Sequence, residues 1–242
     1  MVPRVLCFYN WDGCATIRGK MNYPRLVLAS QSPRRRELLQ LLRLPFEVSI
    51  SDVVETARLG ETPAELVVRL SLAKATGVNL NGNTRVLTVG CDTVVTLEYG
   101  DGDTRILGKP GNAEEAGAML RALRGRFHVV YSAVSTWEPA VGATTDVAKT
   151  CLRMRNYTDA ELAEYVTSGD PLDKAGAYAI QHEGFHPVTE IEGCYASVMG
   201  LPLCHLARAL RRRGCLPVAN VPTACQAYTG HQCNVYQEIL SP

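Results

Sequence analysis

The sequence predicts an α/β protein with a mixed, twisted β-sheet that is flanked by helices and opened by a cleft. Two observations lead to this fold class. Strand-like and helix-like hydrophobic patterns mix along the 242 residues without the strict strand–helix–strand repeat of a parallel sheet. One strand-like segment, 85–95, is a nearly unbroken run of β-branched residues, which is typical of a central strand covered on both faces.

Composition places the chain among globular proteins and excludes several partners. Hydrophobic residues make up 46% and charged residues 20% of the chain. A formal net charge of +1 provides no global field for nucleic acid, and no apolar run reaches the length of a membrane helix. Nine cysteines without a regular framework favour a reducing compartment. We therefore expect a cytoplasmic protein with neither a nucleic-acid nor a membrane partner.

Both ends of the chain differ from the segment between them. Residues 1–24 show no clear period and are interpreted as a start-site extension, with Met21 as the expected natural start. Residues 214–242 form a C-terminal extension of unknown role. It contains four potential zinc ligands: Cys215, Cys225, His231 and Cys233. Their spacing matches no established zinc motif, so free buried thiols are favoured over a zinc site.

The central domain, 25–213, begins with a short strand, 26–29, and a helix that starts after Ser32 and Pro33. Ser32 is a suitable helix cap, and Pro33 sits where a missing N–H is harmless. Three arginines, 34–36, follow directly, although the partial positive charge of a helix N-terminus disfavours them. The pattern predicts a binding site for a polyanion such as phosphate, and a solvated basic turn is the alternative.

The remaining elements follow from hydrophobic period and from caps such as the pair formed by Thr158 and Glu161. In order, we expect a strand at 45–50, a polar loop at 51–62, a helix at 63–77, the central strand at 85–95, a hairpin at 96–107 with its turn at 100–103, a helix at 112–123, an antiparallel pair at 127–137 and 144–154, a helix at 159–166, a polar loop at 168–174, an edge strand at 190–198 and a last helix at 201–212.

Two charged residues, Asp92 and Lys109, occupy unusual positions, whereas the sequence alone explains a third, Lys74, as a lysine that favours the helix dipole. Asp92 lies inside the central strand, where a carboxylate is costly unless it is paired, hydrogen-bonded or metal-bound. Lys109 is fixed on a loop between a glycine and a proline. Lys74 lies at the far end of the 63–77 helix, where it would also favour the helix dipole. Asp92 is therefore the strongest candidate for a functional residue.

Several motifs in order carry a family resemblance: SQSPRRRELL at 30–39, GCDTVV at 90–95, LGKP at 107–110, SGDPLDKAGAYAIQ at 168–181 and GLPL at 200–203. Together they resemble the Maf family of nucleoside triphosphate pyrophosphatases over residues 25–213. The resemblance implies a Maf-like fold, similar to inosine triphosphatase, with a central nucleotide-binding cleft. It also implies hydrolysis of a nucleoside triphosphate to the monophosphate and pyrophosphate.

The resemblance assigns roles to particular residues. Its catalytic residues here are Asp92, Glu55, Lys74 and Lys109, and its phosphate-binding residues are Ser30, Ser32, Arg34 and Arg35. Asp92 and Glu55 would hold a divalent cation, Mg²⁺ or Mn²⁺, whose remaining ligands are water and phosphate oxygens. Two positions depart from the family pattern: Val54, where an acid is frequent, and Cys194, where Asp or Ser is usual.

Two further residues, Thr93 and Gln181, resemble the branch of the family that acts on dTTP and UTP. The amide of Gln181 can both donate to and accept from a uracil or thymine edge. The resemblance implies a role in removing nucleotides from the cellular pool, modified pyrimidines included, and a homodimer. A nucleotide-binding regulator of septum formation without catalysis is the alternative, and the presence of all four catalytic residues favours the enzyme.

Overall fold

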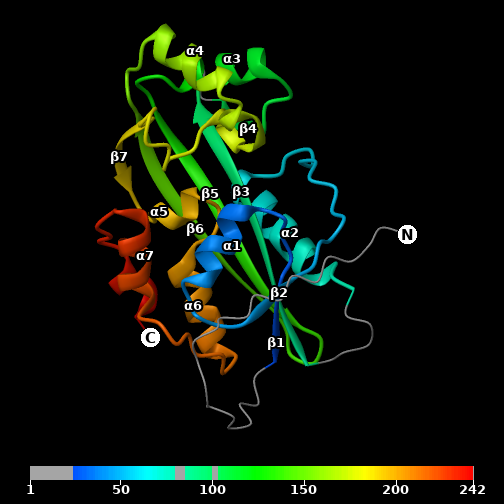
Figure 1. Ribbon diagram of the computed structural model, residues 1–242. Coiled ribbons are helices and arrows are strands. Elements are labelled where there is room, and N and C mark those ends of the chain that lie inside the picture. Colours follow the sequence, from blue (N-terminus) through cyan, green and yellow to red (C-terminus); the bar gives the residue numbers. More distant parts are fainter. Residues whose placement is uncertain (1–23, 80–84, 100–102, 242) are drawn as a thin grey trace.

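The computed structural model describes residues 24–79, 85–99 and 103–241 and is drawn in Figure 1. Its strands are β1 (Arg25–Leu28), β2 (Phe46–Val48), β3 (Val86–Glu98), β4 (Thr104–Leu107), β5 (Phe127–Glu138), β6 (Gly142–Met154) and β7 (Val188–Glu192). Its α-helices are α1 (Pro33–Gln40), α2 (Pro63–Thr76), α3 (Ala113–Leu123), α4 (Asp159–Thr167), α5 (Tyr195–Val198), α6 (Leu203–Arg212), α7 (Val221–Thr229) and α8 (Tyr236–Leu240). Two short 3-10 helices, η1 (Asp170–Asp173) and η2 (Ala175–Ala177), follow α4.

The strands form one seven-stranded sheet in the order β2-β1-β3-β5-β6-β7, with β4 also paired to β3. β1 is parallel to β2 and β3, whereas β3, β5, β6 and β7 are joined by antiparallel pairs. The strand β3 is therefore central, as its β-branched composition predicts. The α/β fold class with a mixed sheet is confirmed.

One edge of β3 is shared by two short strands, and a stretch between them is left open. The start of β3 pairs with β1 up to Val89, and its end pairs with β4 from Val95 onward. Residues 90–94 pair with β5 on the opposite edge and with neither short strand. Asp92 lies in the middle of this open stretch.

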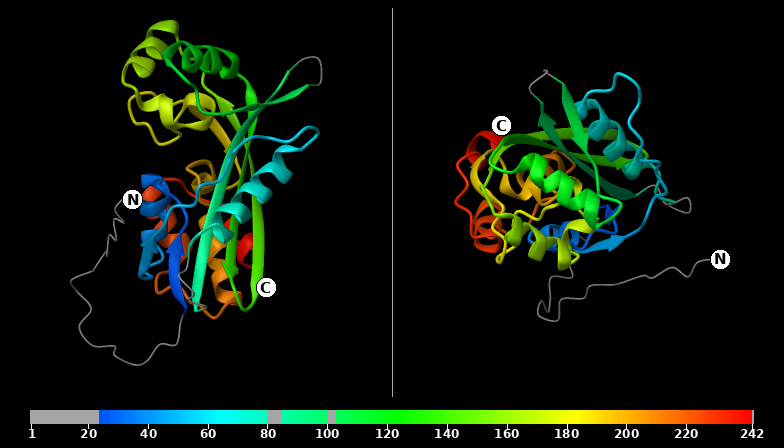
Figure 2. Two further views of the ribbon diagram at one scale, coloured as in Figure 1. Left: turned by 90° about the vertical axis from the view of Figure 1, so that its right-hand side faces the viewer. Right: turned by 90° about the horizontal axis from the view of Figure 1, so that it is seen from above.

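Helices cover both faces of the sheet (Figure 2). On one face Leu66 of α2 packs onto β3 and β5. On the other face two separate layers lie over the long strands. Leu38 of α1 and Leu206 of α6 belong to one core cluster, whereas Leu120 of α3 and Leu162 of α4 belong to another. The open stretch of β3 lies where these two layers meet.

The predicted edge strand at 190–198 is wrong in its second half. The strand β7 ends at Glu192 and pairs with β6 at the edge of the sheet, and the residues after Cys194 form α5. Gly193 has φ of 130°, and a Cβ there would lie 2.7 Å from Oγ1 of Thr150. The chain turns at this glycine, and the backbone N–H of Cys194 donates to Oγ1 of Thr150 at 3.1 Å. This contact with a side chain takes the place of the next backbone hydrogen bond between β6 and β7.

The helices α7 and α8 were not predicted from the sequence. Both lie in the C-terminal extension, and Val221 of α7 is 1% exposed within the core cluster that includes α1 and α6. Asn220 caps α7, and Gly230 ends it in the left-handed conformation. Residues 1–23 and most of the predicted 100–103 turn lie outside the described residues. Within the described part of the chain, no helix combines the length and apolar character needed to cross a membrane.

Candidate active site

A cleft of about 620 Å³ opens between the two helical layers, beside the open stretch of β3. Every site residue selected from the sequence lines this cleft except Asp92, which lies behind Lys74: Ser30, Ser32, Arg34, Arg35, Glu55, Lys74, Thr93, Lys109 and Gln181. The third arginine of the basic turn, Arg36, does not belong to the lining. Residues separated by up to about 150 positions are thus brought to one cavity by the fold.

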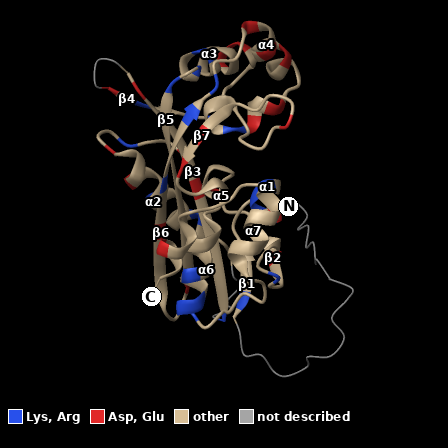
Figure 3. Ribbon diagram, turned by 90° about the vertical axis from the view of Figure 1, so that its left-hand side faces the viewer, with Lys and Arg blue, Asp and Glu red and all other residues tan. Residues whose placement is uncertain are grey.

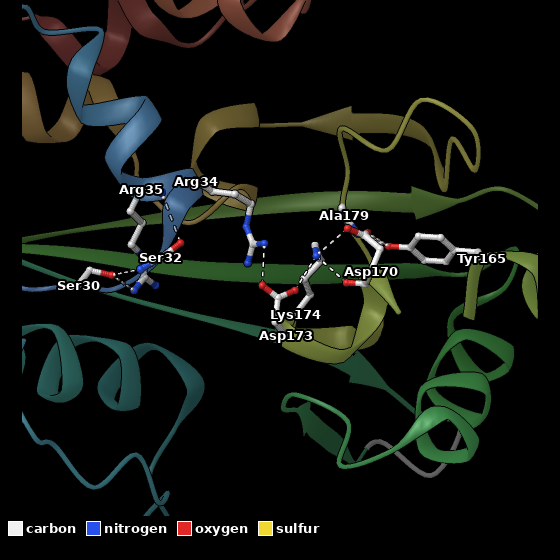
Figure 4. A network of polar contacts seen from close by, with 9 residues as sticks. All are labelled: Ser30, Ser32, Arg34, Arg35, Tyr165, Asp170, Asp173, Lys174 and Ala179. Atoms are coloured by element: carbon white, nitrogen blue, oxygen red, sulfur yellow. Dashed lines mark hydrogen bonds and ion pairs between the residues drawn. The ribbon is translucent and has the colours of Figure 1, made fainter. Parts of the chain in front are cut away.

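The turn between β1 and α1 forms one wall of the cleft (Figure 4). Oγ of Ser32 caps α1 by accepting from the N–H of Arg35 at 3.4 Å. The guanidinium of Arg35 is then held by the carbonyl of Gly200 at 2.8 Å and by Oγ of Ser30 at 3.3 Å. Both serine oxygens accept in these contacts, so their hydroxyl hydrogens remain available for a phosphate oxygen.

The opposite wall depends on the close packing of α2 on β3. Gly90 makes this packing possible, because a Cβ there would lie 2.1 Å from the carbonyl oxygen of Ser71 in α2. The helix therefore places Nζ of Lys74 2.6 Å from Oδ1 of Asp92, which is 5% exposed, and 2.5 Å from Oε1 of Glu55 in the 51–62 loop. The buried carboxylate of Asp92 is thus paired, as its position in a central strand requires.

The electrostatics of this group keep Glu55 ionised. Partial burial raises the pKa of Glu55, but the hydrogen bond from Lys74 and the charges of Lys74, Lys109 and Arg35 outweigh it, so the pKa lies below its ordinary value. The carboxylates of Glu55 and Asp92 converge on one cationic centre, the Lys74 ammonium. Among the described residues no three potential ligands gather into a ready-made metal site. Two converging carboxylates nevertheless fit Mg²⁺, which commonly takes one or two with water and phosphate.

Thr93 lines the cleft, and its hydroxyl is engaged by other residues of the protein. Its Oγ1 lies 2.8 Å from Oγ of Ser132, and Ser132 donates its hydrogen to the carbonyl of Ser197 at 2.6 Å. Thr93 must therefore donate its hydrogen to Ser132. Its oxygen accepts from Nη2 of Arg35 at 3.5 Å. In this arrangement Thr93 orients Arg35 and has no hydrogen left for a base.

Gln181 and Tyr178 lie at the end of the cleft formed by the segment after η2. The amide of Gln181 makes no hydrogen bond to any residue that the structure describes, so it is available to a ligand. The ring of Tyr178 is 5% exposed, and its hydroxyl lies 2.7 Å from Nε2 of the buried His128. Burial lowers the pKa of His128 to about 4.

Comparison with known proteins agrees with this arrangement. The model of a family described as Maf-like protein matches residues 25–213. The chain belongs to the Maf family. It is 42% identical over 188 residues to a dTTP/UTP pyrophosphatase of Bacillus cereus (strain G9842), which covers 78% of this chain and 95% of that protein. It is 43% identical over 188 residues to a dTTP/UTP pyrophosphatase of Bacillus mycoides (strain KBAB4), with the same coverage.

Among solved structures, this Maf chain is similar to a nucleoside-triphosphatase / dITP/XTP pyrophosphatase from Mycobacterium abscessus, with a TM-score of 0.32 and 17% identity over 55% of this chain and 75% of that chain. A TM-score this low supports no argument about the fold, so the expected similarity to inosine triphosphatase stays a prediction.

The Maf cleft also contains residues that the sequence analysis did not single out. Asp173 and Lys174 line it from the segment after α4, and Ser132 supports it from β5. Asp173 and Lys174 lie inside the motif at 168–181, where the sequence analysis drew on Gln181. The alternation of acids and a lysine in DPLDK was a visible signal of an ion-pair cluster. The role of Ser132 depends on strand register and carries no such signal.

Proposed function

We propose that this Maf protein hydrolyses dTTP and UTP to the nucleoside monophosphate and pyrophosphate. The observation that carries the proposal is that Glu55 and Lys74 line the same cleft as Arg34 and Arg35, with Asp92 paired to Lys74 directly behind that lining. The printed activity of the relatives, dTTP/UTP pyrophosphatase, and their identity of about 42% to this chain support the choice of substrate.

The cationic side chains would bind the triphosphate. Arg34, Arg35 and Lys109 surround the cavity, and guanidiniums bind phosphate oxygens through paired hydrogen bonds. Lys109 is exposed at the cleft and makes no ion pair with any residue in the described ranges. Glu55 and Asp92 would hold a divalent cation, Mg²⁺ or Mn²⁺, which neutralises charge on the reacting phosphate when it is bound.

Asp92 would act on the attacking water. Its Oδ1 is held by Lys74, so the carboxylate is fixed in orientation, and it can position a water and take its proton. Positioning and charge neutralisation are the main contributions that a protein makes to phosphoryl chemistry. No covalent intermediate is needed, because the described lining holds no nucleophile paired with a base.

The test is a panel of nucleoside triphosphates assayed with Mg²⁺ or Mn²⁺ for both pyrophosphate and orthophosphate. We expect pyrophosphate from dTTP and UTP, and loss of activity in excess chelator. Orthophosphate release, or undiminished activity in chelator, would contradict the proposed reaction. A cytoplasmic location and a homodimer remain predictions, and sedimentation of the purified chain checks the second.

A further inference from the structure

An ion pair joins two of the segments that line the cleft, the first turn of α1 and the 3-10 helix η1. Nη1 of Arg34, in the first turn of α1, lies 3.2 Å from Oδ2 of Asp173 in η1, and the two residues are 139 positions apart in sequence. Both line the cavity. Figure 4 shows the guanidinium of Arg34 directed at the carboxylate of Asp173. A residue that would bind phosphate is therefore already bound by an anion.

The carboxylate of Asp173 is held in place by a network within its own segment. Nζ of Lys174, a residue that is 8% exposed, donates to Oδ1 of Asp173 at 2.6 Å and to Oδ1 of Asp170 at 2.9 Å. The other oxygen of Asp170 accepts from the hydroxyl of Tyr165 at 2.7 Å, and that hydroxyl accepts from the N–H of Ala179 at 2.9 Å. One oxygen of Asp173 is thus fixed by Lys174, and the other faces Arg34.

The charges of this segment leave uncompensated negative charge on Asp173. Burial raises the pKa values of Asp170 and Asp173, but hydrogen bonds outweigh it: Asp170 accepts from Tyr165 and Lys174, and Asp173 accepts from Lys174 beside the charge of Arg34. Both pKa values therefore lie below their ordinary values, and both groups are ionised at neutral pH. Two carboxylates share one ammonium, and the remaining negative charge faces Arg34. In Figure 3 the basic first turn of α1 faces acidic residues on the chain after α4.

We propose that Asp173 is a built-in competitor for Arg34, a carboxylate that occupies the arginine until a phosphate group displaces it. This inference rests on the proposed function, since it makes the ion pair a regulator of the same cleft. The side chain of Asp173 is 62% exposed and that of Arg34 is 23% exposed. Exposed ion pairs are weak, so a phosphate with a bidentate contact can replace this one.

The competition has a defined kinetic consequence. Every phosphate ligand that binds Arg34 must first break the same ion pair. The binding affinities of the substrate and of the pyrophosphate product are therefore lowered by the same factor. Weaker binding of both raises KM and speeds product release, and it does not change the chemical step. Asp173 therefore limits inhibition by the pyrophosphate product without changing which nucleotide is preferred.

The experiment compares Asp173→Asn with the unmodified chain. The asparagine keeps an oxygen for Lys174 and replaces the oxygen facing Arg34 by an NH₂ group, which cannot bind a guanidinium. Binding of inorganic pyrophosphate is measured by calorimetry, and KM, kcat and the inhibition constant of pyrophosphate are measured with dTTP. Asp159→Asn is the matched control, because it removes a carboxylate from an exposed pair with Arg124 outside the cleft.

Asp173→Asn is expected to tighten pyrophosphate binding about twofold to fivefold, the range for one exposed ion pair, and to lower KM similarly. Asp159→Asn should change neither. In an Arg34→Gln background the gain should disappear, because the carboxylate no longer has its partner. Unchanged or weaker pyrophosphate binding in Asp173→Asn overturns the proposal. An equal gain in pyrophosphate affinity in the Arg34→Gln background also overturns it, as does the absence of pyrophosphate binding to both the unmodified chain and Asp173→Asn. Because calorimetry needs no turnover, a chain that hydrolyses no triphosphate would contradict the proposed function and leave this result readable.

Discussion

Nζ of Lys74 lies 2.6 Å from Oδ1 of Asp92, which connects the last turn of α2 to the middle of the central strand. The contact exists because Gly90 lets the backbone of α2 approach β3 more closely than any side chain would allow. A buried carboxylate and a buried ammonium stabilise each other, and removal of one partner leaves the other charge uncompensated. The candidate catalytic group therefore depends on one glycine in the strand.

Asp92→Asn is expected to lower kcat by about 10²–10⁴, the range for losing general acid–base help, while KM changes far less. The amide keeps an oxygen for Lys74 and removes the base. Steady-state kinetics with dTTP and Mg²⁺ measure the effect, and circular dichroism checks the fold. Asp159→Asn, on the surface of α4, serves as the control for removing one negative charge and should leave kcat unchanged. Turnover at the unmodified rate would show that Asp92 is structural.

Gln181→Glu is expected to lower kcat/KM for dTTP and UTP by about tenfold to a hundredfold. The change replaces an NH₂ donor with an acceptor that faces the carbonyl of the base, and an unmade polar contact in a closed pocket costs about 1–3 kcal/mol. Purine triphosphates should lose less, since they do not make this contact. Gln237→Glu in α8 is the matched control and should change no substrate. An equal loss for all bases would instead place Gln181 beside the phosphates or the metal.

Most of the fold was readable from the sequence because its elements carry strong local signals. The capping box at Thr158 forms as predicted, the helix expected at 63–77 begins at Pro63, and the β-branched run around Asp92 is the central strand. The prediction was wrong where local pattern gives way to tertiary contacts. The segment after Gly193 looks strand-like, yet the hydroxyl of Thr150 takes the N–H of Cys194 and the chain turns into α5.

The candidate site was harder to predict than the fold, because sequence identifies residue types and not their contacts. The site residues selected from the sequence line the cleft or, in the case of Asp92, lie behind it, whereas Asp173 and Lys174 were not selected. That Thr93 donates to Ser132, and that Asp173 reaches Arg34, depends on strand register and on the packing of two layers that are distant in sequence. The helix α7 is a different case, because its two caps, Asn220 and Gly230, are residue types that mark helix ends in a sequence.

The stability of the protein is expected to fall as pH decreases from about 6.5 to 4, in part through His128. Burial lowers the pKa of His128 to about 4, whereas in the unfolded chain it is about 6.5. Between these values the unfolded chain binds a proton that the folded chain does not, so acid favours unfolding. The contribution is complete above pH 6.5 and amounts to at most about 3 kcal/mol.

Urea denaturation of wild type and His128→Gln at several pH values measures this contribution. The amide of glutamine can still bind the hydroxyl of Tyr178 but does not titrate, so the variant should lose less stability between pH 6.5 and 4. His205, whose pKa burial also lowers to about 4, supplies a second, independent test with His205→Gln. Parallel curves for wild type and His128→Gln would mean that His128 is not held neutral in the folded protein.

The C-terminal extension is expected to be a structural part of the domain, although it lies beyond the family match at 25–213. A chain that ends at Arg213 should lose about 3 kcal/mol or more of unfolding free energy, because the extension buries Cys215 and Val221 and packs α8 against the core cluster of α1 and α6. Val221→Ala should cost about 1–2 kcal/mol through two lost methyl groups. Tyr228→Phe removes the exposed 2.6 Å bond to Glu37 and should cost less than about 1 kcal/mol. Urea denaturation measures all three. This order of effects follows if apolar packing holds the extension on α1, whereas a truncated chain as stable as the full one would show that the family domain is complete without it.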